Sequence, residues 1–474
     1  MHILFFNPQG NFDKEDSHLT EHPDFGGQLV YVKEVAMAMV EAGHRVDIVT
    51  RRVIDPDWPE FSEQISHYDS HAPGLRIVRI SCGGDAFLAK EQLWEHMDEF
   101  VAGTIEFYGD TLPDFVTAHY ADGGYCAVLL QSRTGLRFTL TGHSLGAQKM
   151  DKLGMNGANA AELEQRYRFS KRIAAERMAM EQAFQIITST GQERMKQYAH
   201  PLYSGAVDVH DDAKFSVIPP GVNSKVFSTE AVECDHSVIQ KLSSGLNRPD
   251  QPHFLVASRI DEKKNIGGAV AAYVKSPELQ QKAGFIICTR GIDRPFEQIG
   301  SLSEEEQEVL EPILDMISAA NLRDRVEFLD IQSQAELAAT YRYFAARKSV
   351  FVLPSFYEPF GLAPIEAVAC GLACAATSKG GPTEIFADGS AVLIDPTDVE
   401  DMARGLEEAL DNYEELAVCA RERVLDMYTW KKTAARYLSV IAQGMEKGLD
   451  AGCEVPELDA TQRIKTYLGQ ARLW

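Results

Sequence analysis

Short apolar runs alternate with longer stretches of helical periodicity along most of this chain. Apolar runs in the first half predict buried strands at His2–Asn7, Arg45–Thr50, Leu75–Ile80, Phe115–His119, Arg137–Thr141, Gln185–Ser189 and Phe215–Ile218. The periodicity predicts helices at Leu29–Ala42, Lys90–Phe107 and Ala161–Ala183. Strands that alternate with helices in this way indicate βαβ units and parallel sheets.

The same pattern starts again in the second half. Strands are predicted there at His253–Ala257, Gly284–Thr289, Arg325–Leu329, Ser349–Leu353, Ala373–Thr377 and Ala391–Ile394. A Pro-Pro-Gly segment at Pro219–Gly221 and the polar stretch after it separate the halves. We therefore expect an α/β protein with two doubly wound Rossmann-like domains that face each other across a cleft. In such sheets ligands bind at the carboxyl ends of the strands.

The predicted domain boundaries follow from this division. The first domain comprises residues 1–225 together with 430–474, whose helix Trp430–Met445 returns to it, and the second comprises residues 250–429. A length of 474 residues fits two or three domains at about 100–200 residues each.

Composition excludes several classes of function. The formal net charge is −24, which disfavours nucleic acid and anionic membranes as partners. The eight cysteines are scattered without metal-ligand spacing, which is typical of reduced thiols in an intracellular protein. The amino terminus lacks the features of a signal peptide, and no apolar run approaches the ~20 residues that span a bilayer. We expect a cytoplasmic protein, and the sequence leaves its oligomeric state open.

Two carboxylates form the most informative pattern in the chain. Glu358 and Glu366 lie in the segment Ser355–Glu366, directly after the predicted strand Ser349–Leu353. Alone, Glu358 before Pro359 is a turn residue, and Glu366 is a complement to a helix dipole. A glycoside hydrolase also uses two carboxylates. However, both halves of the chain contain segments that are suited to binding phosphate, and these favour transfer from a phosphorylated sugar donor.

The first strand-to-helix connection contains Gly26 and Gly27 at the predicted start of the first helix. Glycines allow a phosphate to approach backbone N–H groups at a helix amino terminus. The spacing is neither that of a dinucleotide fingerprint nor that of a P-loop, so a simple tight turn is an equally good interpretation.

Basic residues cluster in two places. Arg259 and Lys264 follow the first strand of the second half, where cations can meet a diphosphate. A second set in the first half comprises Lys90, Lys149, Arg166, Arg168, Lys171 and Arg172. Ion pairs along a solvated helix face, with Glu162, Glu164 and Glu176 as partners, account for most of the charges within Ala161–Ala183.

The segment Gly142-His143-Ser144-Leu-Gly superficially matches the nucleophile elbow of α/β-hydrolases, with Ser144 as the nucleophile. A hydrolase then needs a later histidine at a strand end. The later histidines fall in loops, at the domain link or at a strand start, which disfavours this alternative.

Together these segments resemble the retaining GT-B glycosyltransferases, in particular the group of sucrose-phosphate synthases and sucrose synthases. The resemblance covers nearly the whole chain and is carried by Phe25–Val32, Thr141–Gly146, Ser258–Asn265, Ser355–Glu366 and Gly380–Glu384. It implies transfer of glucose from a nucleoside diphosphate glucose, with UDP-glucose the expected donor, and with retained configuration. It further implies no required cofactor and no metal, with Mg²⁺ at most a non-essential activator.

The resemblance also implies roles for individual residues. At the donor and the reacting centre, it places Gly26 and Gly27 beside the diphosphate, His143 at the transferred glucose, and Arg259 and Lys264 at the leaving diphosphate. It places Glu358 at the sugar hydroxyls, and the amides of Phe360, Gly361 and Leu362 at sugar and phosphate. Glu366 is expected at the ribose and Gln332 near the base. Those expected at a phosphorylated acceptor are Gln28, Lys90, Tyr120, Ser144, Lys149 and Arg172.

The acceptor distinguishes the members of this group. Fructose 6-phosphate is the expected acceptor, because cations suited to a phosphate occur in the first half, and the expected product is sucrose 6-phosphate. Sucrose synthases act on fructose and usually carry a long amino-terminal extension that this chain lacks. Three alternatives remain: a sucrose synthase that acts on unphosphorylated fructose, transfer of mannose to fructose 6-phosphate, and a sensor that binds a nucleotide-sugar without turnover.

Overall fold

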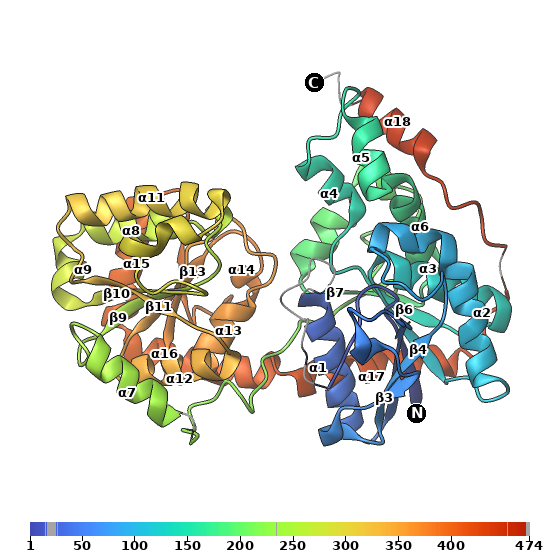
Figure 1. Cartoon of the computed structure of the whole chain (residues 1–474), viewed down its shortest axis with the longest axis horizontal. Coiled ribbons are helices and arrows are strands. Elements are labelled where there is room, and N and C mark those ends of the chain that lie inside the picture. Colours follow the sequence, from blue (N-terminus) through green and yellow to red (C-terminus); the bar gives the residue numbers. More distant parts are fainter. Residues whose placement is uncertain (15, 17–24, 26, 234, 453, 471–474) are drawn as a thin grey trace. The chain divides into compact units, whose positions relative to one another are not determined.

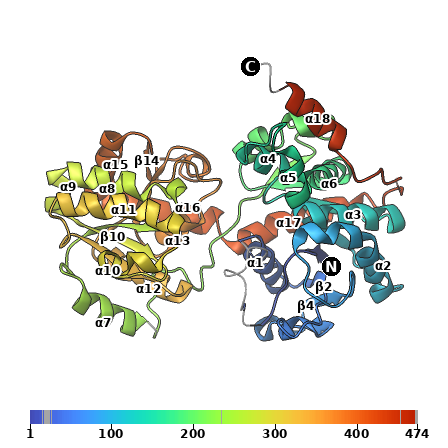
Figure 2. The same ribbon diagram turned by 45° about the horizontal axis from the view of Figure 1, so that its top comes forward.

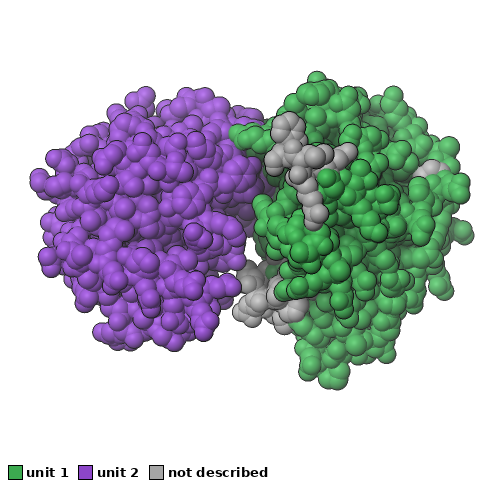
Figure 3. All heavy atoms as spheres, turned by 90° about the horizontal axis from the view of Figure 1, so that it is seen from above, with its two compact units in different colours: residues 1–219, 433–474 green, residues 220–432 purple. Residues whose placement is uncertain are grey.

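The computed structural model describes residues 1–14, 16, 25, 27–233, 235–452 and 454–470. The chain divides into two compact units (Figures 1 and 3). Unit 1 comprises Met1–Pro219 and Thr433–Trp474, and unit 2 comprises Pro220–Lys432.

Unit 1 is built on an eight-stranded sheet with the order β3-β4-β2-β1-β5-β6-β7-β8. Its strands are β1 (His2–Phe6), β2 (Arg45–Arg51), β3 (Ile65–Ser66), β4 (Leu75–Ile80), β5 (Phe115–His119), β6 (Phe138–Thr141), β7 (Gln185–Thr188) and β8 (Phe215–Val217). All pairs are parallel except β3 with β4. The strand order reverses at β1, so the connections after β1, β5 and β6 lie side by side at the carboxyl edge of the sheet.

Helices cover this sheet. Those of unit 1 are α1 (Gly27–Glu41), α2 (Met97–Tyr108), α3 (Tyr120–Thr134), α4 (Gly146–Lys152), α5 (Ala160–Tyr167), α6 (Phe169–Gln182), most of α17 (Trp430–Glu446) and α18 (Thr461–Gln470). Leu4 and Phe6 of β1 belong to a core that includes residues of α2, α3 and α6. Figure 2 shows α18 beside α4, α5 and α6, and Ile464 of α18 joins the same core.

Unit 2 is a six-stranded parallel sheet with the order β11-β10-β9-β12-β13-β14. Its strands are β9 (His253–Ala257), β10 (Gly284–Thr289), β11 (Val326–Asp330), β12 (Val350–Leu353), β13 (Ala373–Thr377) and β14 (Val392–Ile394). Its helices are α7 (Asp235–Gly245), α8 (Ile266–Lys275), α9 (Pro277–Lys282), α10 (Pro295–Gln298), α11 (Glu304–Ala319), α12 (Gln334–Ala345), α13 (Leu362–Ala369), α14 (Pro382–Ile385), α15 (Val399–Asp411) and α16 (Tyr413–Met427).

Alternate residues of β9 separate two cores in unit 2. Phe254 and Val256 pack with residues of α8, α11 and α15 on one face of the sheet. Leu255 packs with residues of α7, α12, α13 and α16 on the other face (Figure 1). Because both faces are covered, the strands are largely apolar, as their sequences indicated, with charged residues on the edge strand β11.

Two predicted helices differ from the structure. The stretch Ala161–Ala183 is two helices, α5 and α6, because Arg168 adopts the left-handed conformation with φ of 51°. Residues Lys90–His96 form a 3₁₀ helix, and the α-helix begins at Met97. Within the described residues, no helix is both long enough and apolar enough to cross a membrane.

The boundaries of the units also differ from the predicted domains. Residues 220–225 and 430–432 were expected in the first domain, and the structure groups them with unit 2. The reason is a backbone pairing in which Val222 N donates to Tyr428 O at 2.8 Å. After this pairing the chain returns to unit 1 through α17.

Candidate active site

In unit 2, the candidate residues lie on the loops that follow β9 and β12, two adjacent strands at the centre of the sheet. Arg259 and Lys264 come from the first loop, and Glu358 comes from the second. Asn265 holds the first loop in place, because its Nδ2 donates to Pro354 O at 3.0 Å and to Pro396 O at 2.7 Å. The switch in strand order therefore brings together residues almost 100 positions apart.

Lys264 and Glu358 form an ion pair. The Nζ of Lys264 lies 3.0 Å from Oε2 of Glu358, and both side chains are partly buried. Arg259 is exposed, and its guanidinium forms no hydrogen bond or ion pair with any residue in the described part of the chain. The arrangement leaves one guanidinium open to an anion and holds one ammonium group beside a carboxylate.

The loop after β13 supports the Glu358 loop through close backbone contact. Glu358 N donates to Lys379 O at 3.1 Å, and Gly381 N donates to Glu358 O at 2.9 Å. A Cβ on Gly380 would lie 2.0 Å from Glu358 O, and a Cβ on Gly381 would lie 2.2 Å from Phe360 O. Glycine is therefore required at both positions if the Glu358 loop is to keep its shape.

Glu366 lies on α13 and is partly buried. Burial raises the pKa of its carboxyl group to about 8, and that group accepts no hydrogen bond from any described residue. A carboxyl group in this state is suited to accept hydrogen bonds from ligand hydroxyls, which stabilise its charged form.

The segment before Glu366 is open to solvent. The large apolar side chains of Phe356, Tyr357 and Leu362 are about 40% exposed, while Phe360 is buried. Gly361, with φ of 118°, is the N-cap of α13 and forms no side-chain hydrogen bond to the first amides of that helix. Apolar side chains left exposed beside backbone N–H groups are a usual feature of a ligand site.

Gln332 lies beyond the end of the edge strand β11. Its side chain is exposed, and its Nε2 donates to Oδ1 of Asp330 at 2.5 Å. β11 is separated from β9 by one strand, so Gln332 is further from the Lys264–Glu358 pair than the other candidates on this sheet.

In unit 1, His143 follows β6 and contacts a second histidine. The Nε2 of His143 lies 3.0 Å from Nδ1 of His119, and the ring of Tyr31 packs edge-on against His143 at 4.9 Å. Burial lowers the pKa of His143 to about 3. His143 is therefore neutral near pH 7 and can take part in hydrogen bonds without carrying charge.

Two residues at this edge have unusual backbone conformations. His143 has φ of 56°, and Tyr120, the first residue of α3, has φ of 68°. Non-glycine residues are uncommon in this region, and such strain concentrates at functional sites.

The predicted acceptor cations are neighbours in unit 1. Arg172 lies over the ring of Tyr120 at 4.6 Å, and Lys149 lies over the ring of Tyr167 at 4.2 Å. Burial, followed by the positive charges of Arg172, Lys90 and Arg166, lowers the pKa of Lys149 to about 8. Mutual repulsion of this kind indicates a cluster that gains stability when an anion binds.

A buried carboxylate orients Arg172. The Oε1 of Glu176, one helical turn further along α6, accepts from Arg172 Nε at 3.0 Å and from Gly146 N at 2.8 Å. Arg172 Nη2 also donates to Ser144 O at 2.6 Å. The sequence predicted Glu176 as part of a solvated face; instead it is 2% exposed, because α6 packs against α3 and α4.

Sequence reasoning missed Asp122, in the first turn of α3. It is 3% exposed, and its Oδ2 accepts from Gln9 N at 3.0 Å. Burial raises its pKa to about 6, and its Oδ1 has no partner within the described residues. It shares the lining of a small pocket with Lys90, Tyr120 and Arg172. Its position directly after β5 was the available signal, but an acidic residue in a first helical turn is commonly a dipole complement.

Gly26 lies outside the described residues. Gly27 begins α1 and is exposed, and a Cβ placed on it would meet no described residue within 4 Å. Gln28 is the next residue, and its Nε2 donates to Asn7 Oδ1 at 2.8 Å. As far as the described residues go, the space around Gly27 is therefore open at the amino terminus of a helix.

The structure gives less support to a serine nucleophile and to a metal site. Ser144 is exposed, and its Oγ lies 3.5 Å from Arg172 Nη2, so it has a cation rather than a general base as its neighbour. Among the described residues, no group of three or more His, Cys, Asp or Glu side chains is arranged to hold a metal ion. The absence of a required cofactor stays a prediction.

Comparisons with known proteins match both halves of the chain to known families. Residues 239–423 match the family model for glycosyl transferases group 1, and residues 85–241 match that for the sucrose synthase first GT-B domain. A probable sucrose-phosphate synthase of Thermosipho melanesiensis is 44% identical over 93% of this chain and 96% of its own length. The sucrose-phosphate synthase of Zea mays is 31% identical over 93% of this chain, which spans only 47% of that relative.

Among solved structures, a sucrose-phosphate synthase from Thermosynechococcus elongatus superposes with a TM-score of 0.65. It is 23% identical, and the match covers 94% of this chain and all of that one. This likeness shows that the two Rossmann-like units form the GT-B fold, as the sequence predicted. Hydrolases of the α/β class have a different fold, so that alternative is excluded.

Proposed function

The chain belongs to the sucrose-phosphate synthase family of glycosyltransferases, and on that premise we propose that it transfers glucose from UDP-glucose to fructose 6-phosphate. The product is sucrose 6-phosphate, and the configuration at the transferred carbon is retained. Unit 2 binds the donor, and unit 1 binds the acceptor.

The observation that carries the acceptor assignment is the cation cluster of unit 1. Lys149 titrates at a pKa of about 8, lowered by burial and by the charges of Arg172, Lys90 and Arg166. Plain fructose offers no charge to relieve this repulsion, whereas the phosphate of fructose 6-phosphate does. Arg172 is already held by Glu176 and Ser144, so it can bind the phosphate with little loss of conformational entropy.

The donor assignment rests on unit 2. Arg259 and Lys264 bind the diphosphate, and Glu358 accepts hydrogen bonds from glucose hydroxyls. The raised pKa of Glu366, about 8, supports a carboxyl group that binds the ribose hydroxyls. The first amides of α13 bind phosphate oxygens, because the amino terminus of a helix attracts negative charge.

The chemistry is a substitution at the first carbon of glucose. The bond from this carbon to the diphosphate oxygen breaks, and the anomeric hydroxyl oxygen of fructose 6-phosphate forms the new bond on the same face. The hydroxyl proton passes to the leaving phosphate oxygen. Arg259 and Lys264 stabilise the charge that develops on the diphosphate. Such electrostatic stabilisation of the transition state is usually the largest single contribution to catalysis.

A coupled assay tests the proposal. Purified protein is incubated with UDP-, ADP- and GDP-glucose and with GDP-mannose, each with fructose and with fructose 6-phosphate, and free nucleotide is measured. We expect UDP-glucose with fructose 6-phosphate to be the preferred pair, and NMR to show the α-configuration at glucose. Equal turnover with plain fructose would instead assign a sucrose synthase activity, and preference for GDP-mannose would assign mannose transfer.

A further inference from the structure

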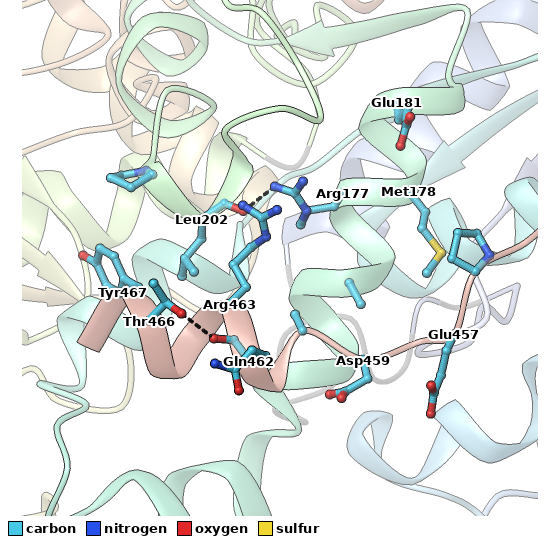
Figure 4. Close-up of a pocket in the computed structure, with 14 residues that line it drawn as sticks. Arg177, Met178, Glu181, Leu202, Glu457, Asp459, Gln462, Arg463, Thr466 and Tyr467 are labelled. Carbon is cyan, nitrogen blue, oxygen red and sulfur yellow. Dashed lines mark hydrogen bonds between the residues drawn. The ribbon is translucent and has the colours of Figure 1, made fainter. Parts of the chain in front are cut away.

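Unit 1 contains a hollow of about 680 Å³ that lies away from the residues assigned above (Figure 4). It is formed by α6, by the turn Pro201–Tyr203, by α18 and by the segment that leads into α18. Its lining residues most relevant here are Arg177, Met178, Leu202, Pro456, Ala460 and Arg463. A volume of this size accommodates a small organic ligand.

Two arginines converge at this hollow (Figure 4). Arg177 Nη1 donates to Leu202 O at 2.6 Å and to Ser204 O at 2.9 Å, and Arg463 Nη1 reaches the same Ser204 O at 3.4 Å. Burial, and then the charge of Arg463, lowers the pKa of Arg177 below its usual value. The two guanidinium groups are therefore close enough to repel each other.

Neither arginine has a carboxylate partner within 4.0 Å in the part of the chain that the structure describes. This is unusual, because the chain has 70 acidic and 46 basic residues. The charge of Glu181 opposes this repulsion, but it affects the pKa of Arg177 less than the charge of Arg463 does. An anion bound between the two guanidinium groups would relieve the remaining repulsion. Their remaining N–H groups form the planar fork that suits phosphate or carboxylate.

The rest of the lining restricts the ligand. Met178, Leu202, Pro456 and Ala460 provide apolar surface next to the arginines. Glu181, Glu457 and Asp459 also line the hollow. Asp459 is engaged, since its Oδ1 accepts from Thr461 N at 2.9 Å at the start of α18. These acidic groups disfavour a polyanion and favour a ligand with one anionic group and a neutral body.

We propose that this hollow is a second anion site, which binds the phosphate group of a small phosphate monoester between Arg177 and Arg463. The site goes beyond the proposed function, because Arg177 and Arg463 are separate from the residues assigned to donor and acceptor. Arg177 lies on α6, the helix that also carries Arg172, five positions earlier in the chain.

Arg463→Gln is the informative substitution, because Arg463 is exposed and makes one long hydrogen bond, so the fold does not depend on it. Lys465→Gln is the matched control, since it removes the same charge from an exposed position on the same helix outside the hollow. Binding of inorganic phosphate and of glycerol 3-phosphate to the full chain is measured by calorimetry and by the rise in Tm at constant ionic strength. Phosphate bound at the acceptor cations is common to all variants and cancels in the comparison.

We expect Arg463→Gln to weaken one class of phosphate site about tenfold, and Arg463→Glu to abolish it, while Lys465→Gln matches the parent. A stronger effect with glycerol 3-phosphate than with inorganic phosphate identifies an ester as the occupant. Identical phosphate binding by Arg463→Gln and Lys465→Gln would overturn the proposal. Failure of the sugar-transfer assay would not affect this result, because the measurement requires no turnover.

Discussion

Lys264 carries its ammonium group 3.0 Å from the Glu358 carboxylate, on loops that follow adjacent strands of unit 2. Both side chains are partly exposed, so the pair contributes about 1 kcal/mol or less to stability. The pair is important for catalysis because it holds a cation at the place where the diphosphate is expected to leave. Catalysis and folding can therefore be separated at this residue.

Lys264→Ala is expected to lower kcat by about 100- to 1,000-fold, because one fixed charge is lost from the leaving group. The Tm should change by no more than a few degrees. Steady-state kinetics and calorimetry on the same preparation measure both quantities.

Lys263→Ala is the control for that experiment. Lys263 is the preceding residue and is exposed, and its backbone O, which the substitution keeps, accepts from Phe356 N at 3.0 Å. Near-parental turnover is expected. If Lys264→Ala is as active as Lys263→Ala, the assignment of Lys264 is wrong.

Lys149 makes acceptor binding depend on pH. Its pKa of about 8 is lowered by burial and by neighbouring cations, so the free protein loses this charge as the pH rises above 8. Binding of the acceptor phosphate restores the proton. The apparent Kd for fructose 6-phosphate should therefore increase above pH 8, by up to about tenfold per pH unit.

Lys149→Arg tests the origin of this dependence, since arginine stays charged over the whole range. Its Kd for fructose 6-phosphate should stay level between pH 7 and about 9. A rise as steep as in the parent would show that another group titrates. Binding of the donor provides the internal reference.

At the scale of elements, the loops after β12 and β13 act as one structure. They are joined by a backbone bridge between Glu358 and Gly380, and the Cβ that alanine would add to Gly380 meets Glu358 O. The position of the Glu358 carboxylate thus depends on a glycine in a different βα connection.

Gly380→Ala is expected to destabilise the fold by more than about 2 kcal/mol, from a positive φ and a direct clash, and to weaken donor binding. Gly389→Ala is the matched control, because Gly389 also has a positive φ, 79°, but open space around it. It should cost about 1 kcal/mol and leave donor affinity unchanged. Equal losses of donor affinity in the two variants would contradict the role of this contact.

At the scale of the whole molecule, α17 returns the chain to unit 1 near its carboxy-terminal end. The Tyr437 hydroxyl lies 3.0 Å from the Tyr31 hydroxyl and 2.6 Å from Thr141 Oγ1, and all three residues are buried. Residues from three distant parts of the sequence therefore share one hydrogen-bond network beneath His143, which packs on Tyr31.

Tyr437→Phe is expected to lower the free energy of unfolding of unit 1 by about 1–3 kcal/mol, because buried hydroxyls lose their partner. Tyr125→Phe is the control, since the Tyr125 hydroxyl has no hydrogen bond to a described residue and its loss should be nearly neutral. Chemical denaturation of both variants measures the difference. A neutral Tyr437→Phe would show that the network does not secure α17.

The sequence determined the local features of this protein. Alternation of apolar strands and amphipathic helices indicated parallel sheets, because that pattern reflects burial on both faces of each strand. The motifs around Gly27, His143, Lys264 and Glu358 indicated the family, since their residue types and spacing are local properties. Where the local signal was weak, as at Arg168, the sequence predicted one helix and the structure has two.

Only the tertiary structure decided which charged groups meet. The sequence predicts Glu176 as a surface charge, but the packing of α6 buries it against Arg172. Asp122 has no signal in the sequence beyond its position in the first turn of a helix. Arg177 and Arg463 lie close together although they are 286 positions apart in the sequence. Their proximity requires the carboxy-terminal segment to lie on α6. Such contacts depend on how strands are ordered and how helices pack, and these long-range choices leave no periodic pattern in the sequence.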